Sequence, residues 1–236
     1  MNWDDYDAAL FDLDGVLTPT AQVHMHAWDR MFNEFLRGRG IEEPYTEADY
    51  FEYVDGKPRY DGVRSFLASR GITLPDGTPD DPPESETVCG LGNRKNAEFT
   101  HILTTDGVRA YPASVRLLDA LAERGTAVAV VSSSRNAPAV LHAAGLADRF
   151  EIVIDGEVGT RENLPGKPAP DTFLVAAERL GAPRDRAVVF EDATSGVAAG
   201  RAGDFGLVVG VDRGVGADAL VAAGADVVVA ELDELL

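Results

Sequence analysis

The 236-residue sequence contains a single cysteine, Cys89, and no long apolar segment. One cysteine cannot form a disulfide bond within the chain, so a reducing compartment, the cytoplasm, is expected. No apolar run reaches the ~20 residues that a membrane-spanning helix needs, which argues against a membrane protein. Residues 1–7, MNWDDYD, are acidic and lack the basic and apolar regions of a signal peptide.

Positive charge is also scarce. The formal net charge is −19, and only three of the 21 basic residues are lysines, at Lys57, Lys95 and Lys167. Proteins that bind nucleic acid hold its phosphates with an excess of Lys and Arg, so nucleic acid is not expected as a partner. A phosphorylated substrate would need local positive charge within this repulsive field. All three lysines fall in segments that other features single out below, although a chance scatter would also explain them.

Short apolar runs alternate with helical patterns over much of the chain. Near-continuous apolarity is typical of strands that are buried on both faces, and hence of a parallel sheet. Helices are predicted at 112–125 and 170–181 from their apolar spacing and their end residues. The alternation indicates an α/β fold with a doubly wound parallel sheet. The predicted strands are 8–11, 126–131, 151–154, 187–190, 206–211 and 226–230, and the predicted apolar helix faces are Val115, Leu118, Leu121 and Ala122, and Phe173, Ala176, Ala177 and Leu180.

Residues 21–105 break this alternation, because they contain helical patterns and no convincing strand. The segment is too long for a connection between a strand and a helix. It is therefore predicted to be an inserted helical domain between the core segments 1–20 and 106–236. Residues 74–87, dense in Pro, Asp and Glu, are expected to form a mobile surface loop within it. The four predicted helices lie near 21–36, 46–54, 62–71 and 91–103.

Polar side chains lie in the segments that follow four predicted strands, near the strands' carboxyl ends, where open α/β sheets bind their ligands. Each group taken alone is more often an ordinary turn or a helix cap. Four groups at one sheet edge favour a functional site, and the serine-rich turn could hold a phosphate. The groups are Asp12 and Asp14 after the first strand, Ser132, Ser133, Ser134, Arg135 and Asn136 after the second, Lys167 beyond the third, and Glu191 and Asp192 after the fourth.

Carboxylates gathered at one edge would repel one another. Two of them about 4 Å apart repel by roughly 4 kcal/mol at an effective dielectric constant of about 20. A hard divalent cation with oxygen ligands relieves this repulsion, and Mg²⁺ is the usual cation beside phosphate. The sequence therefore predicts Mg²⁺-dependent phosphoryl chemistry at this edge.

Four segments resemble, in order, spacing and strand placement, the motifs of the haloacid dehalogenase superfamily. They are FDLDGVLTPT (11–20), VVSSSRN (130–136), GKPAPD (166–171) and VVFEDATSG (188–196). The helical insertion after the first motif resembles the cap of the subgroup that contains β-phosphoglucomutase and small sugar phosphatases. The resemblance implies a core of this superfamily's Rossmann-like type with an inserted helical cap.

The resemblance also implies roles for the residues at the strand ends. Asp12 would be the nucleophile that forms an aspartyl-phosphate, and Asp14 the general acid and base for the sugar oxygen. Lys167 would stabilise the charge of the phosphoryl group, which Ser132 and Ser133 would bind. Mg²⁺ would be held by Asp12, the backbone carbonyl of Asp14, Glu191 and Asp192.

Residues of the insertion acquire implied roles as well. Thr20 and His24, in the segment leading into the cap, would couple cap closure to Asp14; without the resemblance, His24 is read as an ordinary surface residue.

Residues 55–59, DGKPR, resemble the loop that grips a distal phosphate, with Gly56 and Arg59 at the matching positions. Lys95 would face the cleft, and Ser134, Arg135 and Asn136 would contact the phosphate that is not transferred. Asp55 stands where the mutases have lysine, and Gly62 replaces a hydroxyl-bearing residue. These differences leave the identity of the sugar undetermined.

Two activities on a small-molecule sugar phosphate fit these features. The first is a β-phosphoglucomutase-like conversion of a hexose 1-phosphate to the 6-phosphate, and the alternative is a phosphatase that releases the phosphoryl group to water. A catalytically silent binding protein is disfavoured because every expected carboxylate and Lys167 are present. Residues 210–216, GVDRGVG, lack the spacing of a dinucleotide fingerprint. The oligomeric state stays open, and a monomer is compatible with the sequence.

Overall fold

The computed structural model describes all residues, from Met1 to Leu236. The chain forms two compact units, one made of residues 1–20 and 108–236 and the other of residues 21–107. We call them the α/β unit and the helical unit and describe each by itself.

The α/β unit contains one six-stranded sheet in which every neighbouring pair is parallel. The strand order is β3-β2-β1-β4-β5-β6, so the chain winds outward from the centre in both directions. This confirms the predicted doubly wound sheet, with strands that are shorter than predicted at some ends. The strands are β1 (Ala8–Phe11), β2 (Ala127–Val131), β3 (Ile152–Ile154), β4 (Ala187–Glu191), β5 (Leu207–Val211) and β6 (Val227–Val229).

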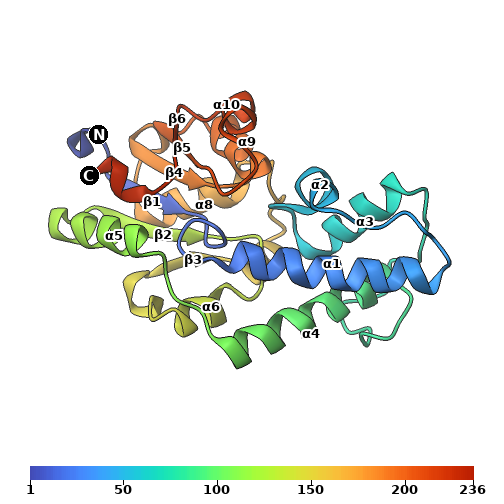
Figure 1. The fold of residues 1–236 in the computed structure, drawn as a ribbon. Coiled ribbons are helices and arrows are strands. Elements are labelled where there is room, and N and C mark those ends of the chain that lie inside the picture. Colours follow the sequence, from blue (N-terminus) through green and yellow to red (C-terminus); the bar gives the residue numbers. More distant parts are fainter. The chain divides into compact units, whose positions relative to one another are not determined.

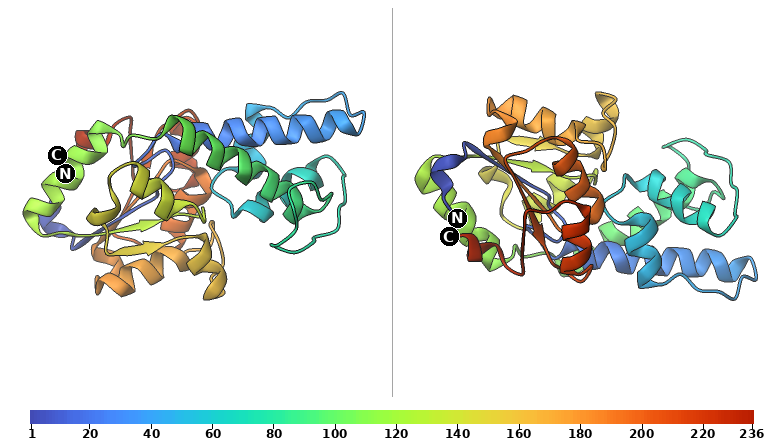
Figure 2. Two further views of the ribbon diagram at one scale, coloured as in Figure 1. Left: turned by 90° about the horizontal axis from the view of Figure 1, so that it is seen from below. Right: turned by 90° about the horizontal axis from the view of Figure 1, so that it is seen from above.

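Helices cover both faces of this sheet. The ribbon views show α5 (Pro112–Arg124) on one side and α8 (Asp171–Leu180) on the other (Figures 1 and 2). Both chain ends lie together in this unit, where the indole Nε1 of Trp3 donates to the carbonyl of Leu235 at 3.1 Å. The remaining helices of the unit are α6 (Ala137–Ala143), α7 (Gly156–Arg161), α9 (Thr194–Ala202), α10 (Ala217–Ala223), η1 (Trp3–Asp5), η3 (Ala147–Arg149), η4 (Arg184–Arg186) and η5 (Leu232–Leu235).

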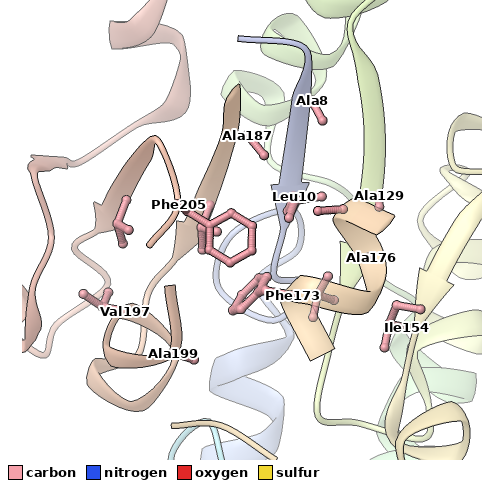
Figure 3. Close-up of a cluster of buried hydrophobic side chains, with 14 of the residues drawn as sticks. Ala8, Leu10, Ala129, Ile154, Phe173, Ala176, Ala187, Val197, Ala199 and Phe205 are labelled. Atoms are coloured by element: carbon pink, nitrogen blue, oxygen red, sulfur yellow. The ribbon is translucent and has the colours of Figure 1, made fainter. Parts of the chain in front are cut away.

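The strands are buried on both faces, which explains their continuous apolar sequence. On one face, Leu10 of β1 packs into a cluster with Phe173 of α8 and Val197 of α9 (Figure 3). Phe11, which points to the opposite face, stacks on Phe190 with ring centroids 4.6 Å apart. A two-sided core of this kind fixes the carboxyl ends of the central strands β1 and β4.

The predicted apolar face of α5 was partly wrong. Leu118 and Leu121 are buried as expected, but Val115 is only half-buried and Ala122 is exposed. The helix turns Ser114 and Leu117 inward in their place. Ser114 was missed because it is polar; its hydroxyl donates to the carbonyl of Val16 at 2.7 Å, which satisfies it inside the core.

The helical unit is built around its own aromatic core. Phe32 of α1 lies at its centre, with ring centroids 5.2 Å from Trp28, 4.9 Å from Tyr45 and 4.2 Å from Phe66. No strand occurs in this unit, and the second predicted helix is a single α-turn continued by a π-helix. The elements are α1 (Thr20–Gly38), α2 (Glu47–Asp49), the π-helix η2 (Tyr50–Val54), α3 (Arg59–Ser69) and α4 (Val88–Asp106).

Residues 74–87 form no helix or strand and lie at the surface, as expected of a loop. Hydrogen bonds nevertheless hold this loop against α4. The side-chain amide of Asn93 donates to the carbonyls of Pro79 at 3.0 Å and Asp81 at 2.8 Å, and Arg94 donates to that of Pro83 at 2.8 Å. The acidic composition therefore did not reveal the contacts that the loop makes with its own helix.

Candidate active site

Lys167 lies at the centre of a buried polar cluster at the carboxyl ends of β1, β2 and β4. Its ammonium group donates to Asp12 Oδ1 at 2.6 Å, to Glu191 Oε1 at 2.5 Å and to the carbonyl of Val131 at 2.9 Å. Lys167 is 4% exposed, Asp12 8% and Glu191 1%. The sheet fixes this geometry, because the backbone N–H of Asp12 continues the β1–β4 ladder to the carbonyl of Phe190 at 2.9 Å. Three segments far apart in the sequence therefore meet as the strand-end rule predicts.

The charges in this cluster do not balance. Burial raises the pKa of Asp12 well above its ordinary value; Lys167 opposes this rise, while Glu191 and Asp14 add to it. Burial alone would lower the pKa of Lys167, but Asp12 and Glu191 outweigh that effect and raise it. Lys167 is therefore charged, and one ammonium group cannot neutralise two carboxylates in a buried site. When both carboxylates are ionised the cluster carries a net negative charge, which a proton on Asp12 or a bound cation would offset.

A third carboxylate completes an oxygen-rich group. Oxygen atoms of Asp12, Glu191 and Asp192 all lie within 4.8 Å of one another. Hard divalent cations prefer carboxylate oxygens, so this set fits the Mg²⁺ ion that the sequence predicts. The Asp14 carboxylate is not a member of the group.

Two glycines allow the carboxylates to come this close. Gly15 has φ of +86°, and a Cβ atom there would overlap the carboxylate of Asp192. A Cβ atom at Gly196, in the first turn of α9, would likewise overlap the carboxylate of Glu191. Any side chain at either position would displace a member of the acidic group.

Asp14 is held by hydroxyl groups on both of its oxygens. Thr20 Oγ1 makes a short hydrogen bond to Asp14 Oδ1, and Ser132 Oγ lies 3.5 Å from Asp14 Oδ2. Thr18 Oγ1 lies 2.7 Å from Thr20 Oγ1 and extends this chain of hydroxyl groups. The structure thus brings together Asp14, Thr20 and Ser132, which the sequence had singled out, and adds Thr18, which it had not.

The turn at 132–136 is held by hydrogen bonds within the turn and by a hydrogen bond to β3. Ser132 Oγ accepts from the N–H of Ser134 at 3.0 Å, and Ser134 Oγ accepts from that of Asn136 at 3.1 Å. These are the local side-chain to backbone bonds of an ordinary polar turn. The N–H of Ser132 donates to the carbonyl of Ile154 at 2.9 Å, which fixes the turn to β3. Arg135 donates to Thr160 at 3.1 Å.

Lys95 and His24 meet inside the helical unit. Lys95 Nζ makes a short hydrogen bond to His24 Nδ1, and it lies 4.9 Å from the Trp28 ring and 5.0 Å from the Phe99 ring. The His24 ring stacks on Phe99 with centroids 4.0 Å apart. Lys95 is 3% exposed. The reading of His24 as an ordinary surface residue is therefore wrong, because it is half-buried between α1 and α4.

Arg59 contacts the same helix as Lys95. Its Nη2 donates to Asn96 Oδ1 at 2.7 Å, and Nη1 lies 3.4 Å from Asn93 Oδ1. Lys57, in the same loop, donates to the carbonyl of Tyr53 and to Ser65 Oγ, both at 2.9 Å. The loop that contains Gly56 is thus tied to η2 and α3 by Lys57 and to α4 by Arg59.

Two contributors to this geometry were missed by sequence reasoning. Thr18 lies inside the first motif, so its hydroxyl could have been found by asking what holds Asp14. Arg213 donates through Nε to the carbonyl of Gly15 at 2.9 Å. It follows β5, and applying the strand-end rule to the fifth strand as well as the first four would have pointed to it.

Comparison with known proteins agrees with the fold and with these motifs. The model of the haloacid dehalogenase-like hydrolase family matches residues 6–204. The β-phosphoglucomutase of Mycobacterium tuberculosis is 54% identical over 97% of this chain and 91% of its own length. That of Bacillus subtilis is 33% identical over 96% and 94%. The crystal structure of β-phosphoglucomutase from Clostridium difficile shares the fold, with a TM-score of 0.77, 23% identity and coverage of 98% and 93%.

The polar cluster at the end of a doubly wound sheet and the matching family model define a class of enzyme. The chain belongs to the haloacid dehalogenase-like hydrolases. Among its relatives are proteins named β-phosphoglucomutase that match it over nearly their whole length. None of its helices combines the length and apolar character that a bilayer span requires.

Proposed function

We propose that this chain is a Mg²⁺-dependent phosphomutase of the β-phosphoglucomutase type, which converts a hexose 1-phosphate to the 6-phosphate. The main support is a buried Asp12 held by Lys167, with Asp14 two residues away, in a chain 54% identical to a β-phosphoglucomutase. The charge imbalance of the cluster supports a cation site made of Asp12, Glu191 and Asp192, with the backbone carbonyl of Asp14. Mg²⁺ bound there would offset negative charge on the phosphoryl group and the carboxylates.

In the proposed reaction Asp12 acts as the nucleophile. One of its carboxylate oxygens forms a bond to phosphorus as the bond between phosphorus and the sugar oxygen breaks. Protonated Asp14 gives its proton to that leaving oxygen. The 6-hydroxyl of a hexose 1-phosphate then attacks the aspartyl-phosphate and loses its proton to Asp14, which restores the Asp12 carboxylate and gives a 1,6-bisphosphate. Attack by Asp12 on the 1-phosphate of this bisphosphate releases the 6-phosphate and forms the aspartyl-phosphate again. The hydrogen bond from Thr20 supports this role, because it orients the Asp14 carboxylate.

Cationic and hydroxyl groups would bind the phosphates. Lys167 is adjacent to Asp12 and would stabilise the transferring group, with Ser132 and Ser133 donating to its oxygens. A mutase that works through a bisphosphate needs a second phosphate site. Within the helical unit, Arg59 and Lys95, two cations associated with α4, are the proposed ligands of that phosphate.

Product analysis separates this function from phosphate release. The enzyme is incubated with β-glucose 1-phosphate, Mg²⁺ and a trace of glucose 1,6-bisphosphate, and both products are quantified. Glucose 6-phosphate without inorganic phosphate is expected. Stoichiometric inorganic phosphate would instead identify a phosphatase, because water rather than a sugar hydroxyl would then attack the aspartyl-phosphate.

Replacement of the nucleophile tests the mechanism. Asp12→Asn keeps the size of the side chain and an oxygen that can accept from Lys167. It should lower kcat/KM by at least about 1,000-fold, as expected when a covalent nucleophile is lost. Asp155→Asn is a matched control, because Asp155 is also buried in the α/β unit but accepts from the N–H groups of Glu157 and Val158 in the cap of α7. Substantial turnover by folded Asp12→Asn would contradict the mechanism.

A further inference from the structure

The loop after β5 has no part in the proposed chemistry, yet it reaches the first motif. Arg213 in this loop donates through Nε to the carbonyl of Gly15 at 2.9 Å. Through Nη1 it also donates to the carbonyl of Ala230 at 2.9 Å and to Glu231 Oε1 at 3.0 Å. Its guanidinium carbon lies 4.1 Å from the centroid of the Tyr111 ring. The side chain is 17% exposed and connects three segments of the α/β unit.

The position of the Gly15 peptide matters for the acidic group. Gly15 directly follows Asp14, and its Cα lies so close to Asp192 that no Cβ atom would fit between them. Its N–H donates to the carbonyl of Thr18 at 2.7 Å and closes the turn of residues 13–18. A shift of the Gly15 carbonyl would therefore move Asp14 and the surface against which Asp192 packs.

Hydrogen bonds of the neighbouring backbone fix the position of Arg213. The N–H of the preceding residue, Asp212, donates to the carbonyl of Val229 at 2.9 Å and extends the β5–β6 ladder. The Asp212 carboxylate accepts from the N–H groups of Gly214 at 2.9 Å and Gly216 at 3.1 Å, which closes the loop. Arg213 is thus anchored on the sheet at its backbone and on Glu231 at its guanidinium group.

We propose that Arg213 is a positioning residue for the active site. It fixes the position of the Gly15 carbonyl. Through this carbonyl it also fixes the Asp14 carboxylate and the position of Asp192 in the acidic group. The planar guanidinium donates in several directions at once, which a lysine ammonium on a flexible stem does not reproduce. Arg213 touches no reacting atom in this scheme. Its effect on turnover rests on the proposed function, whereas its effect on the turn and on cation binding does not.

Arg213→Met, which keeps the apolar stem and removes all donors, tests this role. The matched control is Arg116→Met. Arg116 donates to Asp233 at 3.0 and 2.5 Å, so it holds the same C-terminal segment from α5 and bonds Asp233 instead of the Gly15 carbonyl. The two variants separate loss of C-terminal anchoring from loss of the Gly15 contact.

Three measurements are compared between the variants. Hydrogen exchange of the Gly15, Leu17 and Thr18 amides, all bonded within the turn, should accelerate in Arg213→Met. Calorimetric titration should show Mg²⁺ binding weakened about 10-fold, the usual effect of losing a residue that orients metal ligands. The kcat should fall by a similar factor while KM stays within about twofold. Arg116→Met should change each quantity by no more than about twofold.

The proposal is overturned if Arg213→Met matches Arg116→Met in turn exchange and Mg²⁺ affinity. If Arg213→Met does not fold, Arg213→Lys and Glu231→Gln replace it, since each loosens the guanidinium contacts while keeping a polar side chain. Faster amide exchange in the turn of residues 13–18 in both of these variants supports the proposal. Exchange at the wild-type rate in both variants overturns it. If the wild-type enzyme turns over no sugar phosphate, the proposed function fails, and the exchange and Mg²⁺ titrations still decide the role of Arg213.

Discussion

Asp12 and Glu191 both accept a hydrogen bond from Lys167, so two buried carboxylates share one ammonium group. Such a site is arranged for chemistry at some cost in stability, because burial disfavours the charge that remains. The raised pKa of Asp12 expresses this cost. The cost should vanish when the carboxylate is neutral or when a cation is bound.

This cost makes a prediction for Asp12→Asn in the absence of divalent cations. The folded-state pKa of Asp12 lies above its unfolded value, so its ionisation lowers stability as pH rises through the folded-state pKa. Asparagine cannot ionise, so the Tm of the variant minus that of the wild type, measured in EDTA, should increase from pH 4 to pH 8. Each unit of pKa difference between the folded and unfolded states changes the free energy of unfolding by about 1.4 kcal/mol. Each kcal/mol of that free energy changes Tm by about 2–4 °C.

Two comparisons make this prediction specific to the cluster. Asp155→Asn should change Tm only slightly, because the Asn side-chain oxygen can still accept the two backbone hydrogen bonds of the helix cap and Asn caps helices about as well as Asp. Saturating Mg²⁺ should raise the Tm of the wild type more than that of Asp12→Asn. A pH-independent difference between Asp12→Asn and the wild type in EDTA would contradict the assigned charge imbalance.

At the scale of elements, Lys57 holds the loop between η2 and α3. Its ammonium group bonds the Tyr53 carbonyl near the end of η2 and the Ser65 hydroxyl on α3. Burial lowers the pKa of Lys57, with Asp61 and Glu52 opposing. The lysine is therefore engaged within the helical unit, and this gives it a structural role that its position in the sequence did not reveal.

Lys57→Met should destabilise the helical unit by about 1 kcal/mol, the net worth of a typical hydrogen bond after competition with water, because the half-buried ammonium group is still partly hydrated. Ser65→Ala should cost less, because the lysine keeps its bond to the Tyr53 carbonyl. The double variant should cost less than the sum of the two single changes, as residues in contact do. Urea unfolding of the four proteins measures this coupling; strict additivity would show that the Lys57–Ser65 bond contributes nothing.

The elements differ in how far the sequence could predict them. β1 and β4 were readable because both of their faces are buried, so that every residue is apolar. The strand-end rule then located Asp12, Lys167 and Glu191 without coordinates. The contacts of Arg213 and Lys57 could not be predicted, because each side chain bonds a backbone carbonyl, of Gly15 and of Tyr53, and the sequence does not show which carbonyl a side chain will reach.

Ser114 and the loop at 74–87 show a second limit. Periodicity treats a polar residue as exposed, whereas Ser114 is fully buried because it donates to the Val16 carbonyl. The acidic loop is held by side chains of α4 whose spacing follows helix geometry and carries no sign of a partner. Hydrogen bonds between distant segments are set by tertiary structure, which a local pattern does not encode.

At the scale of the whole molecule, the chain has two cores and one tryptophan in each. Trp3 stacks on Phe190 in the α/β unit with centroids 6.3 Å apart, and Trp28 stacks on Phe32 in the helical unit with centroids 5.2 Å apart. These are the only two tryptophans in the sequence. Trp3→Phe and Trp28→Phe variants therefore leave one fluorescent reporter in each unit.

A core substitution in one unit should be seen chiefly by the tryptophan of that unit. Phe66→Ala removes a fully buried ring from the aromatic core of the helical unit, at a cost of about 3–5 kcal/mol. It should lower the urea midpoint reported by Trp28 much more than that reported by Trp3. Phe173→Ala, which removes an equally buried ring from the α/β core, should give the reverse pattern. Equal shifts of both reporters in both variants would mean that the two cores unfold as one cooperative unit.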